Sequence, residues 1–343
     1  MNEELAIILE TTSKILNKHI NHELRQNITK ENVNLVNLWN DLEEQGLTRI
    51  VVKDKFNGTD LPFSFILPVI QMSNNFGIPL PFSETILCNY LLSESNINPP
   101  NGIVTFATSS KNIKIANNII SGDLLSVPYL NLADNIILIS EINNIKHVIL
   151  LKNTNGNIKA KKNFLAEPRF DLKIGNCEII DFQPLNSKIN FENLGALVRS
   201  AQMIGAMERI LDLSIDYCSQ RKQFGRALSK FQAIQHHISE MAVELSASSA
   251  ALSSVENSND PDKIIQDIAI LKIRAGIAAG KMIAISHQVH GAIGFTQEYE
   301  LAYFTRNLNS WRNDFGNEVF WQNFIGRIFL EKNNQNLWEY LTN

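Results

Sequence analysis

The residue types that could hold a charged ligand gather in two segments of the C-terminal half. Residues 221–226 read Arg-Lys-Gln-Phe-Gly-Arg, and Gln232 follows seven positions after the glycine. Residues 288–299 read Gln-Val-His-Gly-Ala-Ile-Gly-Phe-Thr-Gln-Glu-Tyr, with two glycines three positions apart. Arginine binds phosphates and carboxylates through charge-assisted hydrogen bonds, and glycine lets a backbone approach a ligand closely. Each residue alone also has an ordinary explanation, because arginine and glycine are common at helix C-termini.

A third segment carries the acids that could move a proton. Residues 311–318 read Trp-Arg-Asn-Asp-Phe-Gly-Asn-Glu, which places Asp314 in the predicted loop before the last helix. A carboxylate within hydrogen-bonding reach of an acidic carbon can act as a general base. Asp314 is equally suited to cap the last helix, and Glu318 falls in its first turn, where the helix dipole favours an acid.

The motifs of several other chemistries are missing from the sequence. It contains neither the dinucleotide fingerprint Gly-x-Gly-x-x-Gly nor a P-loop, and neither His-Glu-x-x-His nor Gly-x-Ser-x-Gly. His236 and His237 are adjacent and point about 100° apart on a helix, so they cannot chelate one ion together. The three cysteines at 88, 177 and 218 are spaced for neither a disulfide framework nor a zinc site. We expect no metal.

Charge and hydropathy exclude further classes of protein. The 343 residues include 35 acidic and 31 basic side chains, a net charge of −4. Since no basic run occurs, we expect no nucleic-acid partner. The first ten residues carry acids where a signal or transit peptide needs bases. No run approaches the ~18 apolar residues of a membrane span. The sequence therefore predicts a cytoplasmic protein without membrane insertion.

The chain is long enough for two or three domains, which differ in their sequence patterns. Residues 1–97 mix helical periodicity with loop signals and predict an N-terminal α domain. Residues 98–188 consist of short β-rich runs between turn residues, which predict a small antiparallel sandwich or barrel. Residues 189–343 show long apolar stripes at helical spacing, which predict a four-helix bundle. The expected bundle helices cover about 194–215, 231–255, 261–285 and 317–341.

Taken together, these segments resemble the acyl-CoA dehydrogenase family. Its members carry Arg-x-x-Phe-Gly, a glutamine seven residues after that glycine, then Gln-x-x-Gly-Gly-x-Gly-Phe and a Glu-Tyr pair, on a helical C-terminal domain. The resemblance extends to residues 38–47 (Leu-Trp-Asn-Asp-Leu-Glu-Glu-Gln-Gly-Leu) and 79–85 (Pro-Leu-Pro-Phe-Ser-Glu-Thr). The family's order of α domain, β domain and four-helix domain agrees with the predicted fold, which is mainly α with a central β domain.

The resemblance implies an FAD enzyme that dehydrogenates an acyl-CoA and passes electrons to an electron-transfer flavoprotein. In the family a carboxylate removes the α proton of the acyl-CoA while the flavin accepts a hydride from the β carbon. Arg221 is expected at the FAD pyrophosphate, where charge pairs with charge. In the family the residues that contact FAD reach the flavin of a neighbouring subunit. The resemblance therefore implies a homotetramer, or a heterotetramer with a related subunit. The implied FAD residues are Arg221, Gln223, Phe224, Gln232, Gln288, Gly291, Ala292, Asn317 and Glu318.

The sequence departs from the family at the catalytic base. Alignment without gaps from residue 294 to residue 327 places the family's glycine at Gly316 and its glutamate at Phe315, which cannot accept a proton. The base of other members corresponds to Gly195. Asp314 is therefore the candidate catalytic base, with Gly316 at the substrate. Arg199 is expected to bind substrate, because Ala196 stands where many members have an arginine.

The β domain departs as well, since it is short and lacks the Thr-Glu-x-x-x-Gly-Ser-Asp stretch and the Trp-Ile-Ser or Trp-Ile-Thr segment that face the flavin. Residues 126–128 stand in place of the second segment. Two hypotheses remain. The chain is an FAD-dependent acyl-CoA dehydrogenase with Asp314 as its base, or a non-catalytic subunit that contributes to a partner's FAD site.

Overall fold

The computed structural model describes residues 3–21, 24, 35–153, 157–160, 167–186, 189–258, 260–296 and 298–331. Gln297, the end of the predicted β domain at 187–188 and the predicted helical residues 332–341 lie outside the described residues. Among the helices described, none combines the length and apolarity needed to span a bilayer.

Helices form the N-terminal part, in which apolar residues at helical spacing face inward. On the helix at Val36–Glu44, Leu38, Trp39 and Leu42 are buried, as the 3–4 spacing predicts. The N-terminal elements are α1 (Glu3–His19), α3 (Val36–Glu44), the 3₁₀ turns η1 (Asp54–Phe56) and η2 (Phe63–Phe65), α4 (Ile66–Asn75) and α5 (Phe82–Glu94).

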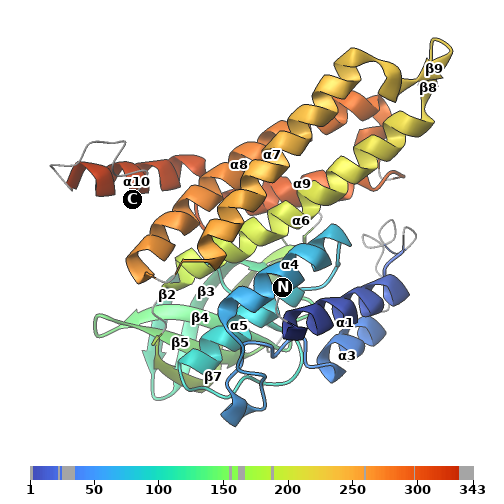
Figure 1. The fold of residues 1–343 in the computed structure, drawn as a ribbon. Coiled ribbons are helices and arrows are strands. Elements are labelled where there is room, and N and C mark those ends of the chain that lie inside the picture. The colour runs from blue at the N-terminus through green and yellow to red at the C-terminus, as the bar shows by residue number, and fades with distance from the viewer. Residues whose placement is uncertain are drawn as a thin grey trace.

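A curled sheet occupies the middle of the chain (Figure 1). Its described strands are β1 (Val104–Phe106), β2 (Ser109–Ala116), β3 (Ile119–Pro128), β4 (Asn135–Ile142), β5 (Ile145–Lys152), β6 (Asn157–Ala160) and β7 (Arg169–Pro184). The order is β1-β4-β5-β7-β3-β2, with β6 also beside β7, and only the β1–β4 pair among them is parallel. The first part of β7 pairs with β3 and β6 and its last part pairs with β5, so this one long strand joins the two halves of the sheet.

The helical domain follows and contains a helix that the periodicity did not predict. Its elements are α6 (Phe191–Gln220), β8 (Lys222–Gln223), β9 (Arg226–Ala227), η3 (Leu228–Lys230), α7 (Gln232–Glu256), α8 (Pro261–His290), η4 (Gly291–Phe295), α9 (Leu301–Asn313) and α10 (Glu318–Glu331). The unpredicted helix is α9, which buries Thr305, Asn307 and Ser310 among its apolar residues. These polar residues interrupt the apolar stripe, so the helical periodicity is not visible in the sequence. In Figure 1 α6, α7 and α8 run side by side, and α10 lies against α8.

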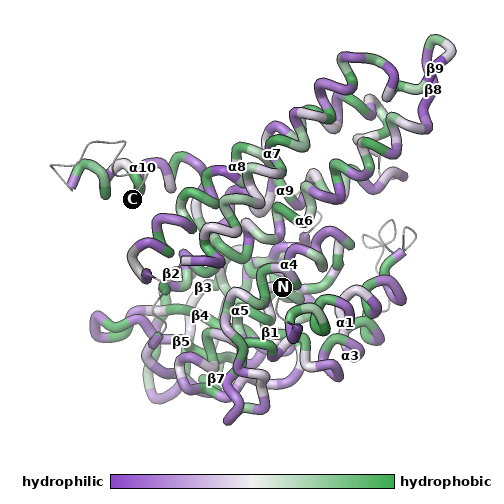
Figure 2. Tube along the Cα trace, in the orientation of Figure 1, coloured by the Kyte–Doolittle hydropathy of each residue, from purple (hydrophilic) through white to green (hydrophobic). Residues whose placement is uncertain are grey.

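All three parts of the chain share one hydrophobic core. Successive side chains of a strand point to opposite faces of the sheet, so neighbouring residues of one strand pack into two different cores. Ile137 faces the shared core, whereas Ile136 and Leu138 fill a second core inside the sheet. Figure 2 shows the apolar residues concentrated where helices meet one another and the sheet.

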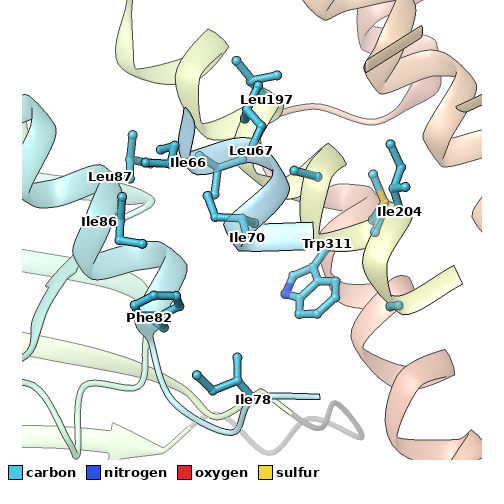
Figure 3. Packing of buried hydrophobic residues seen from close by; sticks show 14 of the residues in the cluster. Ile66, Leu67, Ile70, Ile78, Phe82, Ile86, Leu87, Leu197, Ile204 and Trp311 are labelled. Carbon is cyan, nitrogen blue, oxygen red and sulfur yellow. The ribbon is translucent and has the colours of Figure 1, made fainter. Parts of the chain in front are cut away.

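The contact between α4 and α6 illustrates this packing. Figure 3 shows Ile66, Leu67 and Ile70 of α4 close to Leu197 of α6. A Cβ atom at Gly205 of α6 would overlap the carbonyl of α4's Gln71, so the two helices can approach this closely only at glycine.

Candidate flavin-contacting surface and base loop

Helix α6 separates the predicted site residues into two groups. Gly195 and Arg199 lie in its first turns, and Arg221 follows its last turn. Twenty-six residues at 1.5 Å each place Arg221 roughly 40 Å from Gly195. Figure 1 shows the hairpin of β8 and β9 at the far end of this helix from the sheet. The two groups therefore form two separate sites within one chain.

The first group lies in a buried cluster of charges that joins all three parts of the chain. We call Glu84, Glu167, Arg169, Arg199 and Asp314 the interdomain charge cluster. One terminal nitrogen of Arg199 lies 2.5 Å from Glu84 Oε1 and 3.3 Å from Glu167 Oε2. Arg169 lies 2.5 Å from Glu167 Oε1 and also pairs with Asp314. Glu84 comes from α5, Arg199 from α6 and Asp314 from the residue that follows α9, whereas Arg169 begins β7 and Glu167 lies just before that strand.

Asp314 is the acid of the base loop, which we define as residues 314–317. Its Oδ2 pairs with Arg169 and lies 3.0 Å from Arg199 Nε. Burial alone would raise the pKa of Asp314, but the two arginines outweigh burial and hold that pKa below its usual value. This environment stabilises the charged carboxylate and opposes its protonation, which is unfavourable for a general base.

Arg199 is buried among protein groups. Its side chain is 1% exposed. Besides the carboxylates, its guanidinium donates a hydrogen bond to Gln202 Oε1 at 2.7 Å. The charge of Glu167 is the main influence that raises the pKa of Arg199 against the effect of burial. The role of Arg199 in substrate binding stays a prediction that requires these partners to be released.

Phe315, which alignment without gaps predicts at the family's base position, fills the space beside Gly195. Its ring packs on Phe191 and Phe106, with centroids 5.3 and 5.6 Å apart. A Cβ atom at Gly195 would overlap Phe315 ring carbons. Gly195 and Phe315, the two positions predicted to correspond to the family's bases, are therefore in direct contact. This contact was not predicted, although both residues had been singled out.

Gly195→Ala is expected to destabilise the chain by about 1–3 kcal/mol, because the added methyl group overlaps the Phe315 ring. Phe315→Leu should restore part of that loss in the double variant, giving a favourable coupling in urea unfolding. Gly326→Ala is the control, since open space surrounds Gly326 within α10 and alanine is the better helix former. Additive effects of the Gly195 and Phe315 substitutions would contradict the contact.

Residues 126–128, which are predicted to stand in place of the family's flavin-facing segment, are bonded directly to the base loop through Arg169. Arg169 donates a hydrogen bond to the Ser126 carbonyl at 3.2 Å and pairs with Asp314. Other polar groups of residues 126–128 also bind protein partners: Asp171 accepts from Ser126 N, and the Pro128 carbonyl accepts from Thr105. The family resemblance implies that a flavin ring and an acyl chain would lie between these two segments, which are here bonded to each other. The residues present do not fit a flavin at this position.

The remaining residues of the base loop serve the start of α10. Asn317 Oδ1 accepts a hydrogen bond from the Phe320 backbone at 3.1 Å, so Asn317, rather than Asp314, caps this helix. Glu318 pairs with Arg312. The FAD contacts expected of Asn317 and Glu318 stay a prediction.

Lys272 of α8 holds the end of α9 in front of the base loop. Its Nζ donates to the carbonyls of Trp311 and Arg312 at 3.0 and 2.9 Å. Burial lowers the pKa of Lys272 to about 8, and the charges of Asp314 and Glu318 only partly oppose this effect. No motif or spacing in the sequence marked this lysine as buried.

From the lowered pKa of Lys272 we expect the free energy of unfolding to rise in alkaline solution. Below pH 8 the lysine is charged in both states, and burying that charge is costly. Between about pH 8 and pH 10.4 the folded state releases the proton that the unfolded state keeps, so the free energy of unfolding rises with pH, by about 3 kcal/mol over this range. Urea unfolding should show this rise for the wild type relative to Lys272→Met. Parallel pH profiles of the two proteins would contradict it.

The second group of predicted residues is exposed at the other end of α6. Arg221, Gln223 and Gln232 all have exposed side chains. The Phe224 side chain is 92% exposed, although it is apolar. Phe224 and Gly225 have φ angles of 51° and 79°, which form the tight turn of the β8–β9 hairpin. We call residues 221–227 the hairpin.

The end of α8 presents a second exposed segment. Gln288, Gly291 and Ala292 are exposed, whereas His290 between them is buried. We call residues 288–292 the α8 turn. The ring of His290 stacks on Tyr217, one turn before Arg221, so the α8 turn and the hairpin lie at the same end of the bundle. An exposed arginine, an exposed aromatic ring and three exposed glutamines suit a dinucleotide held by a neighbouring subunit.

Comparison with known proteins identifies the family. Residues 189–326 match the acyl-CoA dehydrogenase C-terminal domain family. The acyl-CoA dehydrogenase IpdE2 of Mycobacterium tuberculosis is 23% identical over 314 residues, which cover 89% of this chain and 91% of that protein. The chain is a member of the acyl-CoA dehydrogenase family of oxidoreductases.

Solved structures confirm the predicted fold. The fold matches the ChsE4-ChsE5 complex from Mycobacterium tuberculosis with a TM-score of 0.85 and 16% identity, covering 96% of this chain and 98% of that one. It matches butyryl-CoA dehydrogenase from Megasphaera elsdenii with a TM-score of 0.83 and 16% identity, covering 96% and 99%.

Proposed function

We propose that this chain is the non-catalytic subunit of a heteromeric acyl-CoA dehydrogenase. Its hairpin and α8 turn contact the FAD of a related subunit that carries the catalytic glutamate. In this complex Arg221 binds the FAD pyrophosphate, Phe224 and Gln232 contact its adenosine side, and the α8 turn approaches it through backbone. When bound, the FAD accepts the hydride from the acyl-CoA.

The state of Asp314 carries this proposal. The one acid of the base loop that stands next to the family's base position is bound by Arg169 and Arg199 inside the protein. Phe315 fills the neighbouring space, and Arg169 connects the base loop to residues 126–128. A self-sufficient dehydrogenase would have to open these contacts to admit both substrate and flavin. A subunit that contributes only its exposed end needs no such opening.

The properties of similar proteins agree with a heteromeric partner. The ChsE4-ChsE5 complex is named for two different chains, and its fold matches this one along nearly the whole length. Another solved structure that shares the fold is described as an electron transferring flavoprotein of Acidaminococcus fermentans. We therefore propose an acyl-CoA as the substrate of the complex and an electron-transfer flavoprotein as its electron acceptor.

The test is to reconstitute the chain with a related acyl-CoA dehydrogenase subunit that retains the base glutamate. Acyl-CoA should then bleach the flavin absorbance of the complex. Replacing the partner's glutamate by glutamine should abolish bleaching, whereas Asp314→Asn in this chain should leave its rate unchanged in complexes that remain folded. If bleaching is instead lost with Asp314→Asn and retained when the partner's glutamate is replaced, then Asp314 is the base and this chain is the enzyme.

A further inference from the structure

Tyr217 contacts both exposed segments at the end of the bundle. Its backbone carbonyl accepts a hydrogen bond from the backbone N–H of Arg221 at 2.9 Å, where α6 gives way to the hairpin. Its ring stacks on that of His290, with centroids 4.5 Å apart and planes 27° apart. Its hydroxyl donates to the His290 carbonyl at 3.3 Å, directly before Gly291. One residue therefore links the start of the hairpin to the α8 turn.

His290 is fixed in turn by contacts on both of its ring nitrogens. It is 4% exposed. Nδ1 lies 2.8 Å from the Ser286 carbonyl and donates to it, because a carbonyl can only accept. Nε2 lies 3.3 Å from the Tyr299 hydroxyl, which also lies 3.4 Å from the Leu213 carbonyl of α6.

His290 and Tyr299 are both uncharged at neutral pH. Burial lowers the pKa of His290, and burial raises the pKa of Tyr299 to about 12. The neutral Tyr299 hydroxyl has one proton, which it donates to the Leu213 carbonyl, and its oxygen lies beside Nε2 of His290, so Tyr299 connects that ring to α6. The His290 ring is held by α6, by its own helix and by the segment after η4.

His290 is the last residue of α8, so its contacts affect the turn that the chain makes after this helix. The next residue, Gly291, has a φ of 66°, and here α8 changes into η4. The direction in which the backbone leaves α8 depends on how the last helical residue is held. Gln288, Gly291 and Ala292 point into solvent around this fixed residue.

We propose that Tyr217 and His290 are positioning residues that set the spacing of the hairpin and the α8 turn, so that both contact one FAD molecule of the partner subunit. The inference rests on the proposed function of these two segments. Two ligand-contacting segments held at a fixed spacing bind more tightly than two that must be ordered on binding. Neither residue touches the FAD in this arrangement.

The experiment measures FAD dissociation from the reconstituted complex with two variants of Tyr217. Tyr217→Leu removes the stack and the hydrogen bond, and we expect FAD affinity to fall on the order of tenfold. Tyr217→Phe keeps the stack, and we expect it to retain affinity within about threefold of the wild type. If Tyr217→Leu does not fold, His290→Phe serves in its place, since it keeps a ring and loses both ring hydrogen bonds; we expect a loss of about threefold to tenfold.

Tyr90→Leu is the matched control. Tyr90 contacts Phe63 at a centroid distance of 4.7 Å in the N-terminal domain. We expect this variant to lose stability in urea without losing FAD affinity. Equal loss of FAD affinity in Tyr90→Leu and Tyr217→Leu, or unchanged affinity in Tyr217→Leu or His290→Phe, would overturn the positioning role. Arg221→Ala separates the two proposals: unchanged affinity in that variant contradicts the proposed function itself.

Discussion

Asp314→Asn is expected to lower the free energy of unfolding by about 3–5 kcal/mol, because it leaves buried arginines without a carboxylate partner. Asp314 serves both Arg169 and Arg199, and the ammonium of Lys272 adds a third positive charge close by. The measurement is urea unfolding of the purified chain. The exposed pair Lys146–Glu192 provides the control, since Glu192→Gln should cost at most about 1 kcal/mol.

The effect of Asp314 should depend on pH in a defined direction. Its pKa is lowered in the folded protein, so its contribution is complete above the unfolded value of about 3.9 and is lost as the pH falls through the lower folded value. The difference in stability between wild type and Asp314→Asn should shrink only in acid. A variant as stable as the wild type at neutral pH would show that the cluster does not hold the three parts of the chain together.

Arg221→Ala is expected to weaken FAD binding by the reconstituted complex on the order of 10- to 100-fold, because a charge-assisted bond to phosphate is lost. Phe224→Ala should cause a loss of similar order by removing an exposed aromatic contact. Neither substitution should change the unfolding of the isolated chain, since both side chains are exposed.

The hairpin contains its own matched control. Lys222 is adjacent to Arg221, is also an exposed cation, and lies outside the residues of the family motif. Lys222→Ala should leave FAD affinity within about twofold, since only general charge attraction is reduced. FAD affinity that responds equally to Arg221→Ala and Lys222→Ala would show a non-specific electrostatic effect instead of a defined pyrophosphate contact.

Much of the fold could be predicted because long helices and short strands have regular spacing. The apolar stripes of α6, α7 and α8 are visible in the sequence, and so is the change to β-rich runs between them and the N-terminal helices. Helix α9 was missed because it buries Thr305, Asn307 and Ser310, which interrupt the stripe. Tertiary packing, which no local pattern records, decides that these polar residues face inward.

The candidate site was also predicted only in part from the sequence. The hairpin residues were found because their spacing along the chain carries the motif, although the exposure of Phe224 could not be predicted from an apolar residue type. The charge cluster was not predicted, because its partners are distant in sequence: 115 residues separate Glu84 from Arg199, and 145 separate Arg169 from Asp314. Glu167 and Arg169 belong to no motif that would have marked them.

The most direct test is the absorbance spectrum of the chain purified alone, then after addition of FAD and removal of the excess, and finally after co-purification with a related subunit. We predict no flavin band from the isolated chain in either condition, and a band in the complex that acyl-CoA bleaches. A flavin band held by the isolated chain and bleached by an acyl-CoA would contradict the account, because substrate and flavin would then enter the space that Phe315 and Arg169 occupy.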